Sequence, residues 1–292
     1  MDTKEASSGC VSEKLQGTFF VVATPIGNLG DISHRALDIL SKVETVLAED
    51  TRHSKRLFNH YGISSKLRAC HEHNEEQILG WLYQQLDSGK DIALISDAGT
   101  PLISDPGFVV VRALRERGYQ VNAVPGASSI IAALSVAGLP TDSFVFDGFL
   151  SAKGPARRTQ LAKYDAESRT IVLLESSHRI VSCLQDIVNV LGKDRRLVIA
   201  RELTKKFETV LDGSAAELLE LLENDTNQTR GEFVLMLQGV QEMESDQADV
   251  SAMLKVLMSE LPLKQAAGIA AKLTGNRKNE VYELALSLKD EG

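Results

Sequence analysis

Short apolar runs alternate with amphipathic stretches over the first half of the chain. The runs predict strands buried on both faces, at 18–23, 45–48, 92–96 and 121–124. Between them, apolar residues recur at helical spacing, in 31–42, after 49–52, and in 74–86, 109–117 and 128–137. This alternation predicts a mostly parallel sheet with helices on both faces.

A turn cluster at 138–142 precedes a second series of the same kind. Its strands are predicted at 144–146, 170–174, 197–200 and 233–237, and its helices at 177–191 and 215–222. The polar, acidic stretch 241–248 is typical of a linker, and 250–288 is predicted to be helical with a break at 274–279. We therefore expect a flexible tail (1–16), two α/β domains with mostly parallel or mixed sheets (17–138 and 139–240), and a small helical segment resembling a helix-turn-helix (249–292).

Charge is distributed unevenly along the chain. The 292 residues hold 32 basic and 40 acidic side chains, a formal net charge of −8. Residues 152–206 contain 12 basic and 6 acidic residues, whereas 207–260 contain 2 basic and 12 acidic ones. The acidic average argues against a protein that coats nucleic acid indiscriminately, but it is compatible with one basic surface for one structured target.

The remaining composition indicates a soluble, cytoplasmic protein without a membrane partner. Cys10, Cys70 and Cys183 are scattered, which favours reduced thiols over a disulfide framework. Residues 1–16 lack the apolar core of a signal peptide, and no run approaches the ~20 apolar residues of a membrane span. No spacing of His and carboxylate residues predicts a metal site.

Candidate ligand-binding loops follow the predicted strands. In open parallel sheets, ligands bind beyond the carboxyl ends of the strands. Four loops there are rich in Gly, Ser, Thr and carboxylate residues, at 25–31, 49–52, 96–107 and 125–129. One such loop is more often a plain turn, but four at one edge favour a ligand site, where Gly admits a ligand to the backbone and Asp or Ser binds hydroxyl or amino groups. Neither a Walker loop nor GxGxxG occurs, which argues against nucleotide-triphosphate and dinucleotide binding.

Six segments, in order along the chain, carry a specific resemblance. They are ATPIGNLGDIS (23–33), AEDTRHS (48–54), ALISDAGTPLISDPG (93–107), VPGASS (124–129), ESSHRI (175–180) and ARELTKKFE (200–208). From about residue 17 to its end, the chain resembles the ribosomal RNA small-subunit methyltransferase I family, a branch of the tetrapyrrole methylase superfamily.

This resemblance implies a cleft between the two α/β domains that holds S-adenosylmethionine (AdoMet). It implies methylation of the ribose 2′-hydroxyl of cytidine 1402 of 16S ribosomal RNA, in the decoding centre of the small subunit, by a homodimer. The implied cofactor-binding residues are Pro25, Gly27, Ser96, Asp97, Ala98, Gly99, Thr100, Ser128 and Ser129. The porphyrin-acting relatives carry GPGD and Gly-Asp-Pro where this chain has Gly27-Asn-Leu-Gly-Asp and Asp97-Ala-Gly, which disfavours a tetrapyrrole substrate.

Methyl transfer to a hydroxyl needs alignment of the reacting atoms and an acceptor for the hydroxyl proton. The candidate acceptors are Asp50, Asp97, Glu175, His178, Glu202 and Lys205. We favour Glu175 or Glu202, from the second domain, and expect Asp97 to orient the cofactor. Pairs such as Glu175 with Arg179 could instead be surface ion pairs, although these stabilise by only about 0–1 kcal/mol.

Basic residues near the strand ends and in the tail are candidates for RNA phosphates. They are Arg52, Arg157, Arg158, Arg179, Arg201, Lys205, Lys206, Arg277 and Lys278. A solvated surface is an equal interpretation for Arg157 and Arg158, and a hairpin that only packs is an alternative for the tail. Two other functions stay open, methylation of a small tetrapyrrole and a non-catalytic module that binds AdoMet or RNA.

Overall fold

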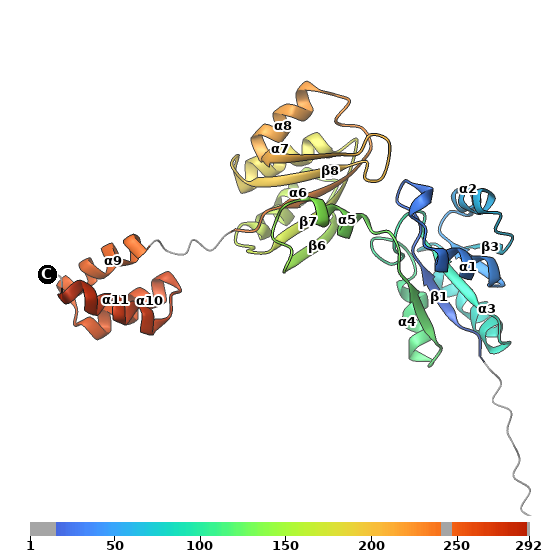
Figure 1. Cartoon of the computed structure of the whole chain (residues 1–292), viewed down its shortest axis with the longest axis horizontal. Helices are drawn as coiled ribbons and strands as arrows, with labels where there is room; N and C mark the ends of the chain where they lie inside the picture. The colour runs from blue at the N-terminus through green and yellow to red at the C-terminus, as the bar shows by residue number, and fades with distance from the viewer. Residues whose placement is uncertain (1–15, 241–246, 291–292) are drawn as a thin grey trace, which may run out of the picture. The chain divides into compact units, whose positions relative to one another are not determined.

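A computed structural model of the chain describes residues 16–240 and 247–290. The chain forms two compact units, Met1–Asp165 with Arg169–Gln238, and Ala166–Ser168 with Gly239–Gly292. The larger unit contains two α/β domains, and the smaller one contains three helices (Figure 1). The expected N-terminal tail, up to residue 15, and residues 241–246 of the expected linker lie outside the described residues.

The first sheet is entirely parallel. Its order is β3-β2-β4-β1-β5, with bounds β1 Phe19–Val22, β2 Thr45–Ala48, β3 Lys66–Ala69, β4 Ile92–Ile95 and β5 Val121–Val124. The four strands predicted from apolar runs are confirmed. The strand β3 was missed because it is a largely exposed edge strand, Lys-Leu-Arg-Ala, without an apolar run.

Helices cover both faces of this sheet, as the alternation predicted. The first face is covered by α1 (His34–Lys42) and α2 (Thr51–Tyr61), whose Leu40 and Phe58 pack on strand residues such as Val46. The other face is covered by α3 (Glu75–Asp87) and α4 (Phe108–Glu116). A short 3-10 turn, η1 (Leu29–Asp31), lies between β1 and α1. Because the strands of this sheet are all parallel, the loops that follow them lie at the same end of the sheet, the carboxyl end of the strands.

The second sheet is mixed. Its order is β6-β7-β10-β8-β9, with bounds β6 Phe144–Phe149, β7 Thr170–Ser176, β8 Arg196–Arg201, β9 Thr209–Ser214 and β10 Glu232–Leu237. The pair β6–β7 is parallel and the other three pairs are antiparallel. The carboxyl ends of β6, β7 and β8 thus share an edge with the amino ends of β9 and β10.

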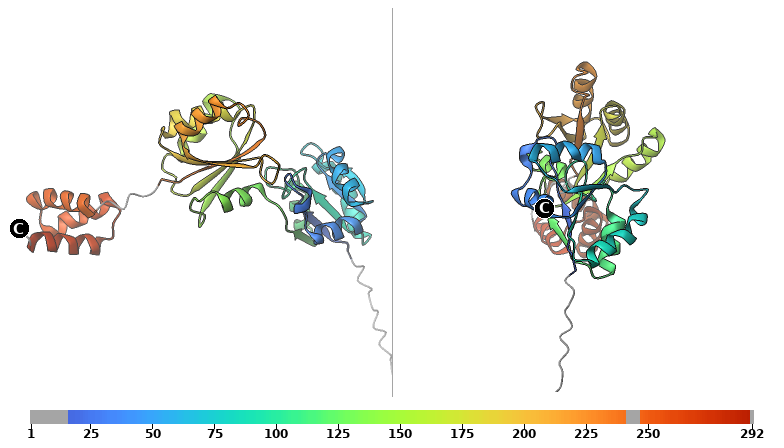
Figure 2. Two further views of the ribbon diagram at one scale, coloured as in Figure 1. Left: turned by 45° about the horizontal axis from the view of Figure 1, so that its top comes forward. Right: turned by 90° about the vertical axis from the view of Figure 1, so that its right-hand side faces the viewer.

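Helices lie on both faces of the second sheet as well (Figure 2). One face carries α6 (Gly154–Leu161), η2 (Ala162–Tyr164), α7 (Ile180–Leu191) and α8 (Ala215–Asn224). The other face carries α5 (Ser129–Val136), whose Ile130 and Ala133 pack against Val172 and Met236. The sequence predicted α5 as the last helix of the first domain. Its side chains pack on the second sheet, and the expected boundary at 138/139 stays a prediction.

The smaller unit is a three-helix cluster. Its helices are α9 (Gln247–Glu260), α10 (Leu263–Thr274) and α11 (Lys278–Asp290), which bury Leu254, Ala267 and Val281. The predicted break after Thr274 is confirmed, with Gly275 at φ +74°. A second break precedes α10 because Pro262 is its N-cap. No helix in the described parts of the chain has the length and apolar character needed to cross a membrane.

Candidate active site

A cavity of about 370 Å³ lies in the larger unit. It is lined by residues near the carboxyl ends of strands in the first sheet and by residues from the edge of the second sheet where β6, β7 and β8 end. The first sheet contributes Glu49, Asp97 and Asp105, which follow β2 and β4. The second sheet contributes Glu175, near the end of β7, and Glu232, at the start of β10. Sequence reasoning placed Asp97, Ala98, Ser129 and Glu175 at the site, and the cavity brings these four together.

The carboxylates of the first sheet repel one another. Burial raises the pKa of Glu49, and the nearby charges of Asp97 and Asp105 raise it further. Burial also raises the pKa of Asp105, and the charge of Asp97 adds to this effect, whereas a hydrogen bond from Ser96 opposes it. A cation bound in the cavity would relieve this repulsion, so the arrangement favours a positively charged ligand.

Apolar side chains form the rest of the cavity wall. Ile26 follows β1, Leu203 follows β8, and Phe233 belongs to β10. Phe233 and Leu203 are buried, whereas Phe149, at the end of β6, is exposed. A cavity with apolar walls and a few convergent polar groups is typical of a small-molecule site.

Two loops at the cavity hold non-glycine residues in the left-handed region. Leu102 and Ser104 have φ of 73° and 65°, and Glu202 and Thr204 have φ of 51° and 65°. Such residues cost about 1–3 kcal/mol each and gather at functional sites. Their position in the two loops that line one cavity is a second indication of function.

Hydrogen bonds fix the loop after β4 to its neighbours. Thr24 and Gly99 exchange backbone hydrogen bonds with N–O distances of 2.8 and 3.1 Å, and Gly99 has φ +82°. The Thr100 hydroxyl donates to the Ala127 carbonyl at 3.1 Å. Glu75, only 5% exposed, accepts from the amides of Gly107 and Val109, both at 2.9 Å. Gly99 and Thr100, expected at the cofactor, thus shape the loop that carries Asp97.

A neighbouring hollow of about 340 Å³ collects other residues expected at the cofactor, namely Pro25, Gly27, Ser96 and Asp97. Ser96 is buried, and its hydroxyl lies 3.4 Å from the carbonyl oxygens of Ala98 and Gly99. Ser128 is the N-cap residue of α5 without a side-chain cap bond. His53, which lines this hollow, and His60 are exposed on α2.

Gly27 permits close contact between loops of the two domains. A Cβ atom at Gly27 would lie 2.5 Å from Cγ of Lys205 and 3.1 Å from Oγ1 of Thr204. The first distance is shorter than Cβ contacts in proteins allow, and the second is tighter than most of them. The glycine is therefore needed for the approach of the loop 202–208, in addition to any contact with a ligand.

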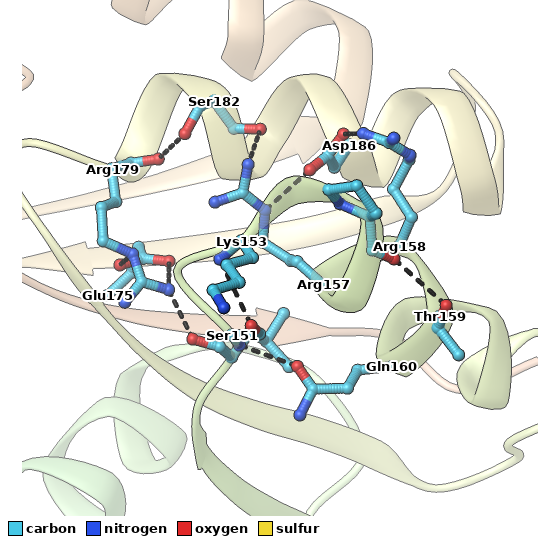
Figure 3. Close-up of polar contacts among 12 residues, drawn as sticks. Ser151, Lys153, Arg157, Arg158, Thr159, Gln160, Glu175, Arg179, Ser182 and Asp186 are labelled. Carbon is cyan, nitrogen blue, oxygen red and sulfur yellow. Dashed lines mark hydrogen bonds and ion pairs between the residues drawn. The ribbon is translucent and has the colours of Figure 1, made fainter.

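Glu175 is buried at the cavity, with a side chain only 1% exposed. It accepts a hydrogen bond from the Ser176 amide at 2.8 Å, and the Arg179 guanidinium lies 3.1 Å from Oε1 and 3.2 Å from Oε2 (Figure 3). Glu175 and Arg179 are thus a cavity pair rather than a surface ion pair. Arg179, expected at RNA, neutralises this carboxylate.

Lys205 bridges two carboxylates beside the cavity. Its ammonium donates to Glu202 at 2.8 Å and to Glu232 at 2.9 Å. Burial acts to lower the pKa of Lys205, but the hydrogen bonds to Glu202 and Glu232 outweigh it and raise that pKa. This arrangement disfavours Lys205 as a proton acceptor, because the ammonium is stabilised.

Glu202 and Asp50 have carboxyl groups that are already engaged. Burial acts to raise the pKa of Glu202, but hydrogen bonds from Lys205 and the Glu232 amide lower it overall. Asp50 is the N-cap of α2 and pairs with Arg52, whose hydrogen bonds lower the Asp50 pKa to about 2. Both are weak proton acceptors, and neither lines the main cavity.

Two arginines expected at RNA are structural. Arg157 is 5% exposed and donates to Asp186 at 2.7 Å and to the Ser182 carbonyl at 3.0 Å, which holds α6 on α7 (Figure 3). Arg201 is 8% exposed and donates to the carbonyls of Asn227, Arg230 and Phe207. The predictions for both are corrected, because their guanidinium groups are turned inward to protein oxygen atoms.

The other cations expected at RNA are accessible in part. Arg158 is about half exposed and contacts Asp186, and Arg52 is exposed but paired with Asp50. Lys206 is exposed near the cavity, and Arg277 and Lys278 are exposed on the smaller unit. His178 is also exposed and lies outside the cavity lining.

Sequence reasoning missed Glu49, Asp105 and Glu232. Glu49 and Asp105 stand in loops that the sequence did single out, next to the residues chosen there. Glu232 begins β10, and the register pairs it with Ser176, beside Glu175. Glu232 precedes its strand instead of following it, and only the antiparallel pairing of β10 brings it to the edge where β7 ends.

Comparison with known proteins identifies the family. The profile described as Tetrapyrrole (Corrin/Porphyrin) Methylases matches residues 18–219, and one described as RsmI C-terminal HTH domain matches 244–289. The chain is 52% identical over 273 residues to a Pseudomonas aeruginosa protein named ribosomal RNA small subunit methyltransferase I, covering 92% of this chain and 97% of that one. An Escherichia coli O157:H7 protein of the same name is 48% identical, with 94% and 96% covered.

This chain belongs to the ribosomal RNA small subunit methyltransferase I family. It is therefore a methyltransferase with a tetrapyrrole methylase fold. Solved structures of that fold resemble it, among them uroporphyrin-III-C-methyltransferase from Thermus thermophilus (TM-score 0.54, 21% identity, 76% of this chain and 94% of that one). A putative diphthine synthase from Entamoeba histolytica is another (TM-score 0.56, 16% identity, 77% and 93%). At these identities the likeness concerns the fold alone.

Proposed function

We propose that this chain transfers a methyl group from AdoMet to the 2′-hydroxyl of cytidine 1402 in 16S ribosomal RNA. The cavity that five carboxylates line, together with apolar walls, carries the proposal. The relatives named for this subunit support the RNA as the substrate. The family resemblance supports the position in the RNA.

The residues of the cavity fit AdoMet. Glu49, Asp97 and Asp105 suit its ammonium and sulfonium charges, and their mutual repulsion decreases when a cation binds. Ile26, Leu203 and Phe233 offer apolar surface for the adenine, and a volume of about 370 Å³ falls in the range of small-ligand sites. We assign cofactor contacts to Asp97, Ala98 and Ser129 in this cavity.

AdoMet supplies an electrophilic methyl group on a sulfonium. In an in-line displacement, the ribose oxygen forms a bond to the methyl carbon while the carbon–sulfur bond breaks and sulfur keeps the electron pair. The protein accelerates this step chiefly by alignment of the hydroxyl with the carbon–sulfur axis. The fixed loops after β4 and β8, with their strained residues, hold the walls in place for that alignment.

We assign acceptance of the hydroxyl proton to Glu175. It lines the cavity, and the Ser176 amide and Arg179 hold its carboxylate in one orientation. The other acceptors that the sequence favoured are less suited, because neither Glu202 nor Lys205 lines the cavity and Lys205 is a stabilised ammonium. Glu175→Gln should therefore reduce the rate of transfer and leave AdoMet affinity almost unchanged.

The proposal includes the small ribosomal subunit as a partner, a homodimer, and a cytoplasmic location with the ribosomes. Lys206 and Arg158 are exposed cations on the larger unit that suit RNA phosphates, and Arg277 and Lys278 are exposed on the smaller one. Exposed Ile131 and Val136 on α5 suit a contact between copies.

The deciding experiment uses labelled AdoMet and small subunits that lack the modification. The expected result is label on the 2′-oxygen of cytidine 1402. Label on a porphyrinoid but none on the subunit would replace the proposal with a tetrapyrrole methylase. AdoMet binding without transfer to either acceptor would indicate a non-catalytic module.

A further inference from the structure

A second hollow, of about 270 Å³, lies beside the main cavity. Arg201, Glu202, Phe207, Asn227, Arg230 and Gly231 line it. It is formed by the loop between β8 and β9 and the loop before β10. Lys205 links it to the main cavity, since its ammonium binds both Glu202 in this hollow and Glu232 in the cavity.

Phe207 presents an aromatic ring to solvent at this hollow. The residue is 63% exposed, whereas phenylalanine side chains are more often buried in an apolar core. A hydrogen bond holds its backbone, because the buried Arg201 donates to the Phe207 carbonyl at 3.2 Å. The same guanidinium binds the carbonyls of Asn227 and Arg230, at 2.9 and 3.2 Å, and so joins the two loops. The backbone that carries the ring is thus tied to the neighbouring loop.

Two cations near the ring have no carboxylate partner among the described residues. The Lys206 ammonium lies over the Phe207 ring, 5.4 Å from its centre, and the exposed Arg230 lines the same hollow. Neither forms an ion pair with any residue that the structure describes.

The nearby carboxylates are already engaged. Glu202 binds Lys205, Glu208 accepts from the Thr204 amide, and Asp225 accepts from the Asn227 amide. Glu208 and Asp225 keep their negative charge when they accept from amides, so the hollow offers exposed cations outside ion pairs and an aromatic face rather than a net positive charge.

We propose that the hollow binds a nucleotide that neighbours the target, with its base stacked on Phe207 and its phosphate at Lys206 and Arg230. An aromatic face takes any base by stacking, and exposed cations fix phosphates. The bridge through Lys205 places this contact one hydrogen-bonded side chain away from the cavity. The inference rests on the proposed function, since it takes the target ribose to occupy the main cavity.

The first test compares Phe207→Ala, Phe207→Leu and Phe207→Trp in the full chain, with small subunits as substrate. Loss of one stacked base by alanine substitution lowers affinity roughly 5- to 150-fold. We expect KM for the subunit to rise in this range for the Ala and Leu variants, kcat to change little, and the Trp variant to retain the KM of the unmodified chain. Phe144→Ala, which removes an exposed ring outside both hollows, is the matched control. Unchanged KM in both Ala and Leu variants would overturn the inference.

The second test measures stacking directly and does not require methyl transfer. A single-stranded RNA oligonucleotide with one 2-aminopurine is titrated with the full chain, and quenching of its fluorescence reports stacking. We expect quenching with the unmodified chain and Phe207→Trp, and its loss with Phe207→Leu. Arg230→Gln should keep the quenching and lower the salt dependence of binding by about one phosphate contact.

The two tests separate the inference from the function on which it rests. Quenching that depends on the ring, in a protein that methylates no RNA, would retain the nucleotide site and reject the proposed function. Methyl transfer with quenching that does not depend on the ring would reject the nucleotide site alone. Weaker binding of subunits with unaltered oligonucleotide binding would point to a protein contact and would also reject it.

Discussion

Replacement of Arg157 by Met tests whether this arginine stabilises the fold or binds RNA. Arg157 is buried, and its guanidinium donates to the Asp186 carboxylate at 2.7 Å and to the Ser182 carbonyl at 3.0 Å. Its removal leaves a buried carboxylate whose remaining ion-pair partner is Arg158, at 3.1 Å. Methionine fills a similar volume, so the lost polar partner is the main change.

The expected cost follows from this geometry. Removal of one partner from a buried ion pair costs about 3–5 kcal/mol. Because Arg158 still contacts Asp186, we expect the lower end, about 3 kcal/mol in the free energy of unfolding. For a unit of this size, that corresponds to a fall in the unfolding midpoint of roughly 6–12 °C.

The pH dependence of the effect has a definite sign. Burial acts to raise the pKa of Asp186, but hydrogen bonds from Arg157 and Arg158 outweigh it and lower that pKa. The stabilisation is therefore complete above the ordinary carboxyl pKa and is lost as the pH falls through the lowered value. The difference in the free energy of unfolding between the Arg157→Met variant and the unmodified chain should therefore decrease at acidic pH.

Urea denaturation followed by circular dichroism measures the effect. Arg158→Met is the matched control, and its cost should stay below about 1 kcal/mol because its side chain is half exposed. In a second variant, Arg157→Met with Asp186→Leu should recover much of the stability, because it leaves no buried charge unpaired, and Arg158, which loses Asp186, is half exposed. An Arg157→Met protein of unaltered stability that has lost RNA binding would refute the reasoning.

Three further predictions concern the site. Glu49→Gln should flatten the pH dependence of AdoMet binding, because the Glu49 carboxylate attracts a cation fully above its raised pKa and loses this attraction below it. Calorimetry at several pH values measures the affinity, and an unaltered pH profile would contradict the prediction. Gly27→Ala should lower methyl transfer, because its Cβ would lie 2.5 Å from Lys205, whereas Gly80→Ala, with open space at its Cβ, should leave transfer unchanged. Glu75→Gln should cost about 1–3 kcal/mol in urea denaturation, because it weakens two backbone hydrogen bonds beside the loop after β4, and equal stability would count against that role.

The strands that sequence reasoning missed lie at the edges of the sheets. Runs such as 92–96 were identified correctly because a strand buried on both faces is apolar throughout. The strands β3 and β9 are edge strands with exposed polar residues, so no run marks them. The helix α6 was also not predicted. Part of its attachment to α7 is the polar contact of Arg157 with Asp186, which leaves a weaker apolar pattern in its sequence.

The sequence located the edge at which the site would form, but selected only some of its side chains. The loops after β2 and β4 were singled out by their composition, and Asp97 and Glu175 do line the cavity. Glu232 was not foreseen, because the direction of β10 depends on its antiparallel pairing with β7 and β8, which are distant in sequence. The cavity also needs Gly27 where the other domain approaches.

The sequence by itself determined the alternation of strands and helices, the loops at the ligand-binding edge and the family. Those features are local, since periodicity, turn residues and short motifs lie within a few neighbouring positions. Only the tertiary structure decided which charges are available. Arg157 and Arg201 carry the same charge as Lys206 and Arg230. The first two donate hydrogen bonds to oxygen atoms from distant segments, whereas the other two are exposed to solvent. The role of a charged side chain depends on the partners that folding brings to it, and the linear sequence does not contain those distances.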